Sequence, residues 1–333
     1  MVACDLWHDE WVTFNNNLGN YSNRGSTGDS GGGGGGFNLG GGGGGGRNNL
    51  LFTLLFSTIG RRFGIPGLIV VGIAMFIFSG GMGSLTGNNS SHQAGVGNHQ
   101  GGTQVGQGAD FSHCKTAEDA NNNDDCRLLA TGVSLDQFWS QALPQEAGIQ
   151  YTEPKLVIAE GQVSTGCGTS NISQTGPFYC PNGQTVYMSV PFFDQLRQMG
   201  GSDGAFSQMY VTAHEFGHHI QNLQNTLGLS DYNNPGADSN AVKLELQADC
   251  YAGLWATHAD KGSNALLEPL TQTQVEQAVT TAKSIGDDAI QSSSGQEVNP
   301  DQWTHGSSEQ RVEWFTRGYQ GGTMQSCAQD FNR

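Results

Sequence analysis

The sequence is poor in basic residues. Its 333 residues include 14 Lys and Arg against 30 Asp and Glu, and the formal net charge is −16. The ten basic and 26 acidic residues of the stretch 110–333 account for this whole excess, because residues 1–64 carry equal numbers of both signs. Binding to nucleic acid phosphates requires a basic surface, so nucleic acid is excluded as a partner. The acidic surface is typical of a soluble domain.

The seven cysteines include no Cys-x-x-Cys pair, which argues against a cysteine zinc site. Cys4 stands apart near the N-terminus, and the other six follow residue 110. An even number of cysteines predicts disulfides in an oxidising compartment. If cysteines that are neighbours along the chain pair, the three disulfides are Cys114–Cys126, Cys167–Cys180 and Cys250–Cys327. Other pairings of the six cysteines stay open.

Charged residues are absent from residues 64–85. A helix of this length is about 33 Å long, enough to cross a bilayer core of about 30 Å. A signal peptide would begin nearer the N-terminus, and a buried helix of a soluble domain is rarely so apolar, so we predict a single transmembrane helix. Arg47, Arg61 and Arg62 precede it, and no basic residue follows until Lys115. The positive-inside rule then predicts a cytoplasmic N-terminus and a periplasmic or extracellular domain.

Glycine is abundant, with 51 residues, and it is concentrated in runs at 31–36 and 40–46. Such runs bury too little apolar surface to offset the entropy of ordering them. We therefore predict a disordered, Gly- and Asn-rich cytoplasmic segment over residues 1–63 and a flexible linker over residues 86–109. Residues 110–333 are long enough to form one folded domain with a core.

The folded domain is predicted to be α+β, mainly helical with a small sheet. Runs rich in Val, Ile and Tyr predict strands at 155–160 and 185–190. Ser134 and Pro191 are placed to begin the first two helices. The predicted helices cover residues 134–142, 191–199, 203–227, 241–259, 273–285 and 307–317.

A five-residue stretch, His214-Glu215-Phe216-Gly217-His218, matches the His-Glu-x-x-His pattern. Residues four apart share one face of a helix, so His214 and His218 can offer two imidazoles to one metal ion. Zinc accepts such nitrogens at about 2.0–2.1 Å in a tetrahedral site. Glu215 is placed to act as general base on the attacking water. The apolar residues of this helix recur on another face, which favours a cleft for the histidines over simple packing.

Glu245 is the candidate for a third ligand, which a zinc site with one open position requires. Glu245 and Asp249 are four residues apart on the next predicted helix and share a face. We predict that Glu245 binds one zinc per chain with the histidines, and that Asp249 fixes the tautomer of His214. The alternative is that both acids are solvated helix charges. Ala252 and Gly253 are small enough to let the two helices approach closely.

Three further histidines compete for the metal. His219 points about 100° away from His218 on the helix, which favours a structural hydrogen bond. His258 is predicted to lie on the surface. His305 precedes the last predicted helix, where it could donate to the oxyanion of a tetrahedral intermediate, so we take it as a candidate catalytic residue. Helix capping or packing is the alternative role for this segment.

Four stretches together resemble the bacterial family called putative neutral zinc metallopeptidases, which are membrane-anchored proteins with a zincin-like domain. The resemblance covers roughly residues 111–330 and rests on AHEFGHH at 213–219, LELQADCYAG at 244–253, GPFYCP at 176–181 and THGSS at 304–308. The wider likeness is to thermolysin-type gluzincins, in which a second helix carries Glu-x-x-x-Asp. The resemblance implies a zinc metallopeptidase with a zincin-like α+β domain, and it does not supply a substrate.

The predicted function is hydrolysis of peptide bonds in a peptide or protein substrate by a membrane-anchored zinc peptidase. A substrate of such an enzyme can add to a sheet edge as an extended strand, and Thr185–Val190 is the predicted edge. One alternative is a non-catalytic anchored scaffold, which has no need for the base Glu215. The other is hydrolysis of a non-peptide amide, such as a cell-wall crosslink, in the same site.

Overall fold

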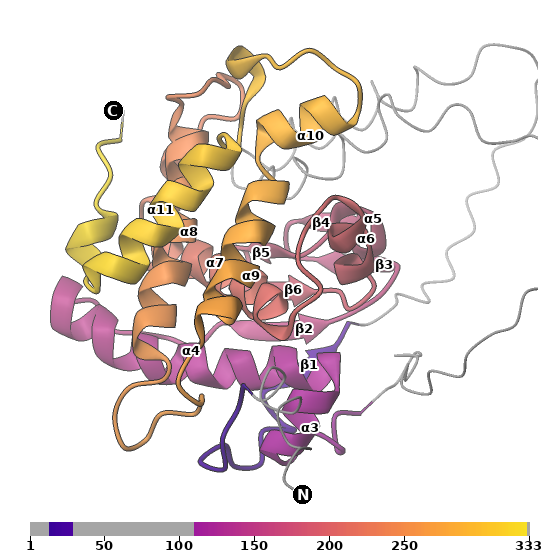
Figure 1. Cartoon of the computed structure of the whole chain (residues 1–333), viewed down its shortest axis with the longest axis vertical. Coiled ribbons are helices and arrows are strands. Elements are labelled where there is room, and N and C mark those ends of the chain that lie inside the picture. Colours follow the sequence, from indigo (N-terminus) through magenta and orange to yellow (C-terminus); the bar gives the residue numbers. More distant parts are fainter. Residues whose placement is uncertain (1–12, 29–109, 332–333) are drawn as a thin grey trace, which may run out of the picture.

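The computed structural model describes residues 13–28 and 110–331, which form a mainly helical α+β domain. Helix α4 (Asp124–Ala147) passes below a small sheet, and α8 (Asn240–His258), α9 (Gln272–Ser284) and α11 (Ser308–Gly321) stand beside that sheet (Figure 1). Helix α7 (Ala205–Leu223) packs against α4, α8, α9 and two of the strands. The α+β prediction is therefore confirmed, and α7 lies at the centre of the domain.

The main sheet is mixed, with strand order β1-β2-β6-β5. Strand β2 pairs in parallel with β1 and β6, while β5 runs antiparallel to β6. The bounds of these strands are Gly25–Thr27 for β1, Lys155–Ile158 for β2, Phe178–Cys180 for β5 and Thr185–Met188 for β6. A separate hairpin joins β3 (Gln162–Thr165) to β4 (Gly168–Asn171). The predicted edge at 185–190 is wrong, because β6 lies between β2 and β5.

Most predicted helices are confirmed, and side chains cap the first turns of three of them. Ser239, Thr271 and Ser307 accept hydrogen bonds from the first turns of α8, α9 and α11. The prediction that Ser134 begins a helix is wrong, since α4 begins ten residues earlier at Asp124. The remaining short helices are α3 (Ala117–Asn122), α5 (Ile172–Thr175), α6 (Phe192–Gln198), α10 (Asp287–Ser293), η2 (Leu227–Leu229), η3 (Pro300–Gln302) and η4 (Met324–Cys327).

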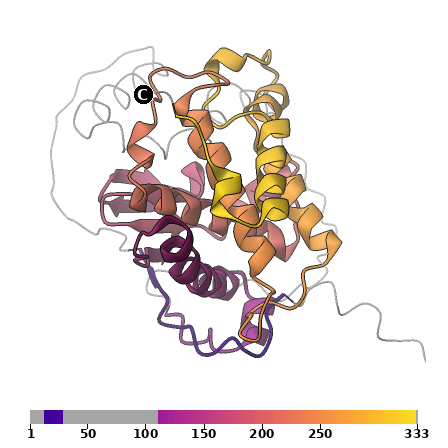
Figure 2. The same cartoon turned by 90° about the vertical axis from the view of Figure 1, so that its left-hand side faces the viewer.

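The segment 13–28 is an ordered part of the domain, so the prediction of disorder over residues 1–63 is wrong for these residues. Phe14, Leu18 and Tyr21 are buried in the main core. Phe14 forms a β-bridge with Leu267, and Figure 2 shows the indigo segment running along the base of the domain. The segment escaped prediction because its apolar residues are sparse and its strand partners lie far away along the chain.

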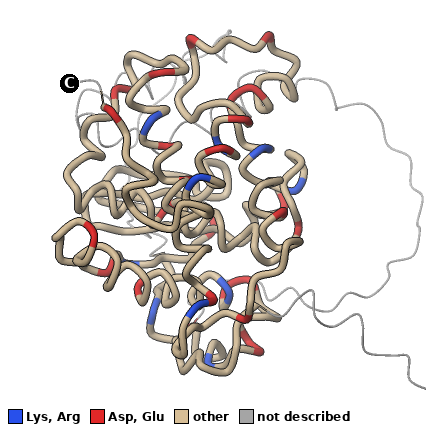
Figure 3. The backbone as a smooth tube through the Cα atoms, turned by 60° about the vertical axis from the view of Figure 1, so that its left-hand side comes forward, with Lys and Arg blue, Asp and Glu red and all other residues tan. Residues whose placement is uncertain are grey.

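Pairing of β1 with β2 has a consequence for topology, because two paired strands occupy one compartment. The prediction that the N-terminal segment and the domain lie on opposite sides of the membrane is therefore wrong for residues 13–28. The predicted membrane span, residues 64–85, and the linker 86–109 lie outside the described residues. Within 13–28 and 110–331, none of the helices combines the length and the apolar composition that a bilayer crossing requires. Acidic residues are spread over this part of the chain rather than gathered on one face (Figure 3).

All three predicted disulfides are present: Cys114–Cys126, Cys167–Cys180 and Cys250–Cys327. The first links the residues before α3 to the start of α4. The second ties the β3–β4 turn to strand β5, and the third fixes η4 on α8. Because stable disulfides belong to oxidising compartments, they support an extracytoplasmic location of the domain.

Candidate metal centre

The two helices that carry the predicted ligands meet at a glycine. A Cβ atom on Gly217 would lie 2.9 Å from the Cα of Ala248, so only glycine allows this close approach of α7 to α8. The sequence prediction placed the close approach at Ala252 and Gly253, and for Gly253 this is wrong. Gly253 faces the backbone of α11 at Phe315 instead. The contact at Gly217 brings the histidines of α7 opposite Glu245 of α8.

His214, His218 and Glu245 form a buried cluster whose candidate ligand atoms all lie within 4.8 Å of one another. Nε2 of His214 is 3.2 Å from Oε2 of Glu245, and Nε2 of His218 is 3.6 Å from Oε1. In a tetrahedral zinc site, bonds of about 2.1 Å place neighbouring ligand atoms about 3.4 Å apart. The donor types and their spacing therefore fit a zinc ion.

His214 has charged partners on both ring nitrogens. Its Nδ1 lies 2.8 Å from Oδ1 of Asp249, as predicted from the sequence. Asp249 is fully buried, and Arg311 of α11 donates to its two oxygens from Nε and Nη2, each at 2.9 Å. The hydroxyl of Tyr210 also donates to Asp249. Arg311 and Tyr210 were missed from the sequence, because no local pattern connects them to Asp249.

Charge balance in this cluster favours a cation. Burial alone would lower the pKa of His214, but the Asp249 carboxylate outweighs it and raises the pKa to about 10. Burial alone would raise the pKa of Glu245, but His218 and His305 outweigh it and hold the pKa well below its ordinary value. Two carboxylates thus flank His214: Arg311 compensates Asp249, and the proton on His214 compensates Glu245. A divalent cation between Glu245 and the imidazoles would replace this proton.

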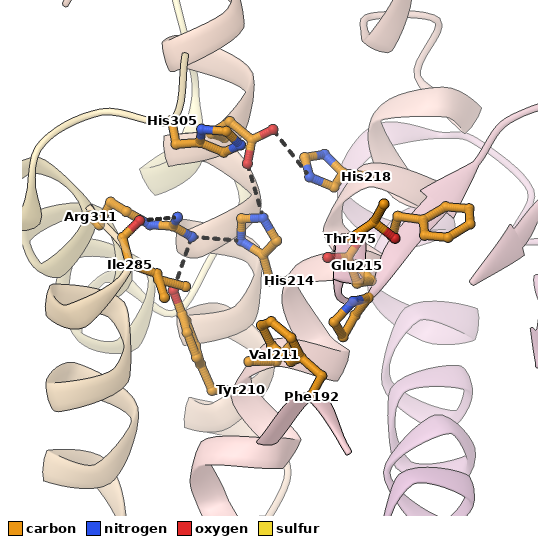
Figure 4. Close-up of a pocket in the computed structure, with 13 residues that line it drawn as sticks. Thr175, Phe192, Tyr210, Val211, His214, Glu215, His218, Ile285, His305 and Arg311 are labelled. Atoms are coloured by element: carbon orange, nitrogen blue, oxygen red, sulfur yellow. Dashed lines mark hydrogen bonds and ion pairs between the residues drawn. The ribbon is translucent and has the colours of Figure 1, made fainter. Parts of the chain in front are cut away.

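Glu215 and His305 lie at the same cavity as the cluster, and Figure 4 shows them with His214, His218 and Arg311. Glu215 is 7% exposed, and burial raises the pKa of its carboxyl above the ordinary value. His305 reaches the cavity from the loop before α11. The lining of the cavity also includes four apolar side chains: Phe178, Phe192, Val211 and Ile285.

The His305 loop is held by an aspartate at the start of α10. Oδ2 of Asp287 accepts hydrogen bonds from the backbone nitrogens of Thr304, His305 and Gly306, at 2.7 to 3.1 Å. Its other oxygen lies 3.3 Å from Nδ1 of His305. This leaves the far side of the imidazole toward the cavity. Asp287 lies 18 residues before His305, and no local sequence pattern connects the two residues.

His219 and His258, the other two histidines considered as ligands, lie outside the cluster, as predicted. His219 is buried between the carbonyl of Thr152, 2.6 Å from Nε2, and the hydroxyl of Tyr179, 3.0 Å from Nδ1. Burial lowers the pKa of His219 to about 4. His258 is exposed and contacts a backbone carbonyl near the C-terminus.

A second group of potential ligands surrounds His113 and Asp125 within the described residues. Its two cysteines, Cys114 and Cys126, are joined to each other as a disulfide and cannot act as thiolate ligands. The metal chemistry of the described chain therefore concentrates at His214, His218 and Glu245.

Comparison with known proteins places these residues in a wider group. The model of a family described as "Putative neutral zinc metallopeptidase" matches residues 11–330. The uncharacterized protein Rv2575 of Mycobacterium tuberculosis is 44% identical over 229 residues, covering 67% of this chain and 76% of the relative. The uncharacterized protein YpfJ of Escherichia coli K12 is 38% identical over 232 residues, covering 66% of this chain and 77% of the relative. No solved structure matches.

Proposed function

The chain belongs to the putative neutral zinc metallopeptidase family, and from that premise we propose that it is a zinc-dependent peptidase with a zincin-like domain. The buried cluster of His214, His218 and Glu245 carries the proposal, because its spacing fits one zinc ion and leaves room for a fourth ligand. Glu215 lies at the same cavity without belonging to the cluster.

The two imidazoles and the Glu245 carboxylate would hold one zinc per chain. A zinc ion bound there would supply Lewis acidity toward a scissile carbonyl and would lower the pKa of a water molecule. Glu215 then takes a proton from the attacking water and passes it to the leaving amine. Its raised pKa suits a group that must both accept and release a proton. His305, oriented by Asp287, donates a hydrogen bond to the carbonyl oxygen as negative charge develops there.

The proposed substrate is an extended peptide or protein segment. Strand β5 is an edge of the main sheet, and its first residue, Phe178, lines the cavity. A peptide that pairs with β5 would have its backbone fixed by main-chain hydrogen bonds and its side chains directed at the apolar walls. This placement replaces the strand at 185–190 that the sequence suggested.

The experiment that tests this function compares two variants of the full-length protein. Glu215→Gln should keep the fold and the zinc, while hydrolysis of a peptide library falls about 10²–10⁴-fold, because an amide cannot take the proton. Glu245→Ala should instead lose zinc, because a ligand is removed. Metal content and hydrolysis are measured on both. Full activity in Glu215→Gln, or full zinc in Glu245→Ala, would contradict the assignment.

We place the peptidase domain outside the cytoplasm, on the basis of its three disulfides. Membrane attachment through residues 64–85 stays a prediction from the sequence. Because β1 pairs with β2, residues 13–28 should share the compartment of the domain.

Labelling of introduced cysteines on intact cells tests this placement. Gly19→Cys is suitable because a side chain there meets no neighbour, and Gln141→Cys marks an exposed site on α4. Both are made with Cys4→Ser, since the other six cysteines form disulfides. A membrane-impermeant maleimide should label both variants alike. Labelling of Gly19→Cys only after lysis would contradict a shared compartment.

A further inference from the structure

His218, the second histidine of the metal cluster, is held by a series of hydrogen bonds between neutral groups. Its Nδ1 lies 2.9 Å from Oε1 of Gln221, one turn along α7. Nε2 of Gln221 lies 2.6 Å from the carbonyl oxygen of Leu244 and 3.1 Å from Oε1 of Gln247. Nε2 of Gln247 in turn lies 2.9 Å from the carbonyl oxygen of Cys327. The three side chains that form this series of hydrogen bonds are all buried.

The direction of each hydrogen bond follows from the two backbone carbonyls. A carbonyl oxygen only accepts, so the amide nitrogens of Gln221 and Gln247 must face Leu244 and Cys327. The amide oxygen of Gln221 then faces His218 and can only accept. Nδ1 of His218 must therefore carry a proton. Its Nε2 is left to face Glu245, where a metal ion would bind.

We propose that Gln221 is a positioning residue of the metal site, which fixes the tautomer of His218 and joins the two ligand-bearing helices. The proposal rests on the zinc site proposed above. Gln221 serves both purposes with one amide group: its oxygen holds His218, and its nitrogen holds the carbonyl of Leu244, the residue that precedes Glu245. The spacing between the two ligands is thereby coupled to the tautomer of one of them.

Gln247 orients this amide rather than touching a ligand. Its oxygen accepts from Gln221 and its nitrogen donates to Cys327, which the disulfide to Cys250 fixes on α8. Without Gln247, Gln221 would still have the Leu244 carbonyl as its acceptor. Loss of Gln247 should therefore affect the metal site less than loss of Gln221.

The test uses three leucine variants of the full-length protein. Gln221→Leu removes both amide functions, and Gln247→Leu removes the orienting partner. Gln224→Leu is the matched control, because Gln224 is the C-cap residue of α7, three positions after Gln221, but accepts from Tyr251, away from the ligands. Zinc affinity is measured by competition with a chelator. Gln221→Leu should bind zinc about 10–100-fold more weakly, as expected for a lost outer partner of a ligand. Gln247→Leu should lose less, and Gln224→Leu should match the wild type.

Long-range proton–nitrogen NMR of ¹⁵N-histidine-labelled wild-type protein supplies a readout that does not depend on any variant folding. The His218 ring, assigned with a His218→Gln variant, should carry a proton on Nδ1 both with and without zinc. An Nδ1 without a proton overturns the proposal, as does wild-type zinc affinity in Gln221→Leu. If the wild type binds no zinc at all, the zinc site fails, while the tautomer measurement still decides the role of Gln221.

Discussion

Helix α7 has two faces that use buried histidines in opposite ways. On the cavity face, His214 lies between two carboxylates, and its pKa rises to about 10. On the face toward strand β5, His219 lies between a hydroxyl and a carbonyl, and its pKa falls to about 4. Both rings are almost fully buried, so burial does not distinguish a ligand from a structural residue. The charge of the groups that contact the two ring nitrogens distinguishes His214 from His219.

The structural face also receives the N-terminal segment. Arg24 pairs with Asp136 of α4, and its guanidinium lies 5.7 Å from the ring centroid of Phe216. In the sequence, Phe216 follows Glu215 directly and precedes Gly217. Tyr151 donates to the same Asp136 carboxylate. These contacts join α7 to α4 on the side of α7 that faces away from the cavity. Changes on the cavity face should therefore affect zinc, whereas changes on the structural face should affect only stability.

The largest effect is expected from Arg311→Leu, which removes an α11 side chain that lines the cavity opposite α7. This change leaves the fully buried Asp249 without its cation, and breaking a buried ion pair in this way costs about 3–5 kcal/mol. Denaturant unfolding of the full-length protein measures the loss. Arg311→Lys, which keeps the charge but not the paired geometry, should lose less. A loss below about 1 kcal/mol, a surface-pair value, would show that Asp249 does not need this partner.

A smaller effect on the metal is expected from Asp249→Asn, beside a loss of stability because the buried Arg311 loses its carboxylate partner. The amide is similar in size to the carboxylate but no longer supplies negative charge to His214. Zinc affinity, measured by chelator competition, should fall about 10–100-fold. Unchanged affinity would mean that the charged support of His214 is irrelevant to the metal, and the contrast between the two faces would lose its basis.

The smallest effect is expected from His219→Leu, on the structural face. Tyr179 and the Thr152 carbonyl lose a partner, so the free energy of unfolding should fall by about 1–2 kcal/mol while zinc affinity stays unchanged. The wild type should also lose stability as pH falls from about 6.5 toward 4, because the unfolded state then binds a proton that the fold rejects. The variant should lack this component. Zinc loss with normal stability would instead place His219 in the metal site.

The sequence revealed the parts of the site that depend on local spacing. His214 and His218 are one turn apart, and Glu245 and Asp249 repeat that spacing on the next helix, so helical periodicity was enough. Arg311 could not be found in this way, because it meets Asp249 across 62 positions, through the packing of α11 on α8. Gln221 lies one turn after His218, a spacing at which side chains can meet, but its role depends on the carbonyl of Leu244.

The same distinction between local sequence patterns and long-range contacts applies to the elements of the fold. Helices α7, α8, α9 and α11 were predicted because each carries a long periodic pattern or a capping residue. Strand β1 was missed, because Gly25, Ser26 and Thr27 show no apolar alternation and pair with residues about 130 positions later. Strand β6 was found but placed at the wrong position, since strand order is a property of the assembled sheet and not of any one strand.

Zinc K-edge X-ray absorption on the purified full-length protein tests whether His214, His218 and Glu245 hold a zinc ion. We expect one zinc per chain, with two imidazole nitrogens at about 2.0–2.1 Å and oxygen ligands at about 2.0–2.2 Å from Glu245 and a water. The Glu245→Ala protein provides the comparison and should lose the metal. Sulfur at about 2.3 Å, or wild-type protein that binds no zinc, would contradict the assignment of His214, His218 and Glu245 as the site.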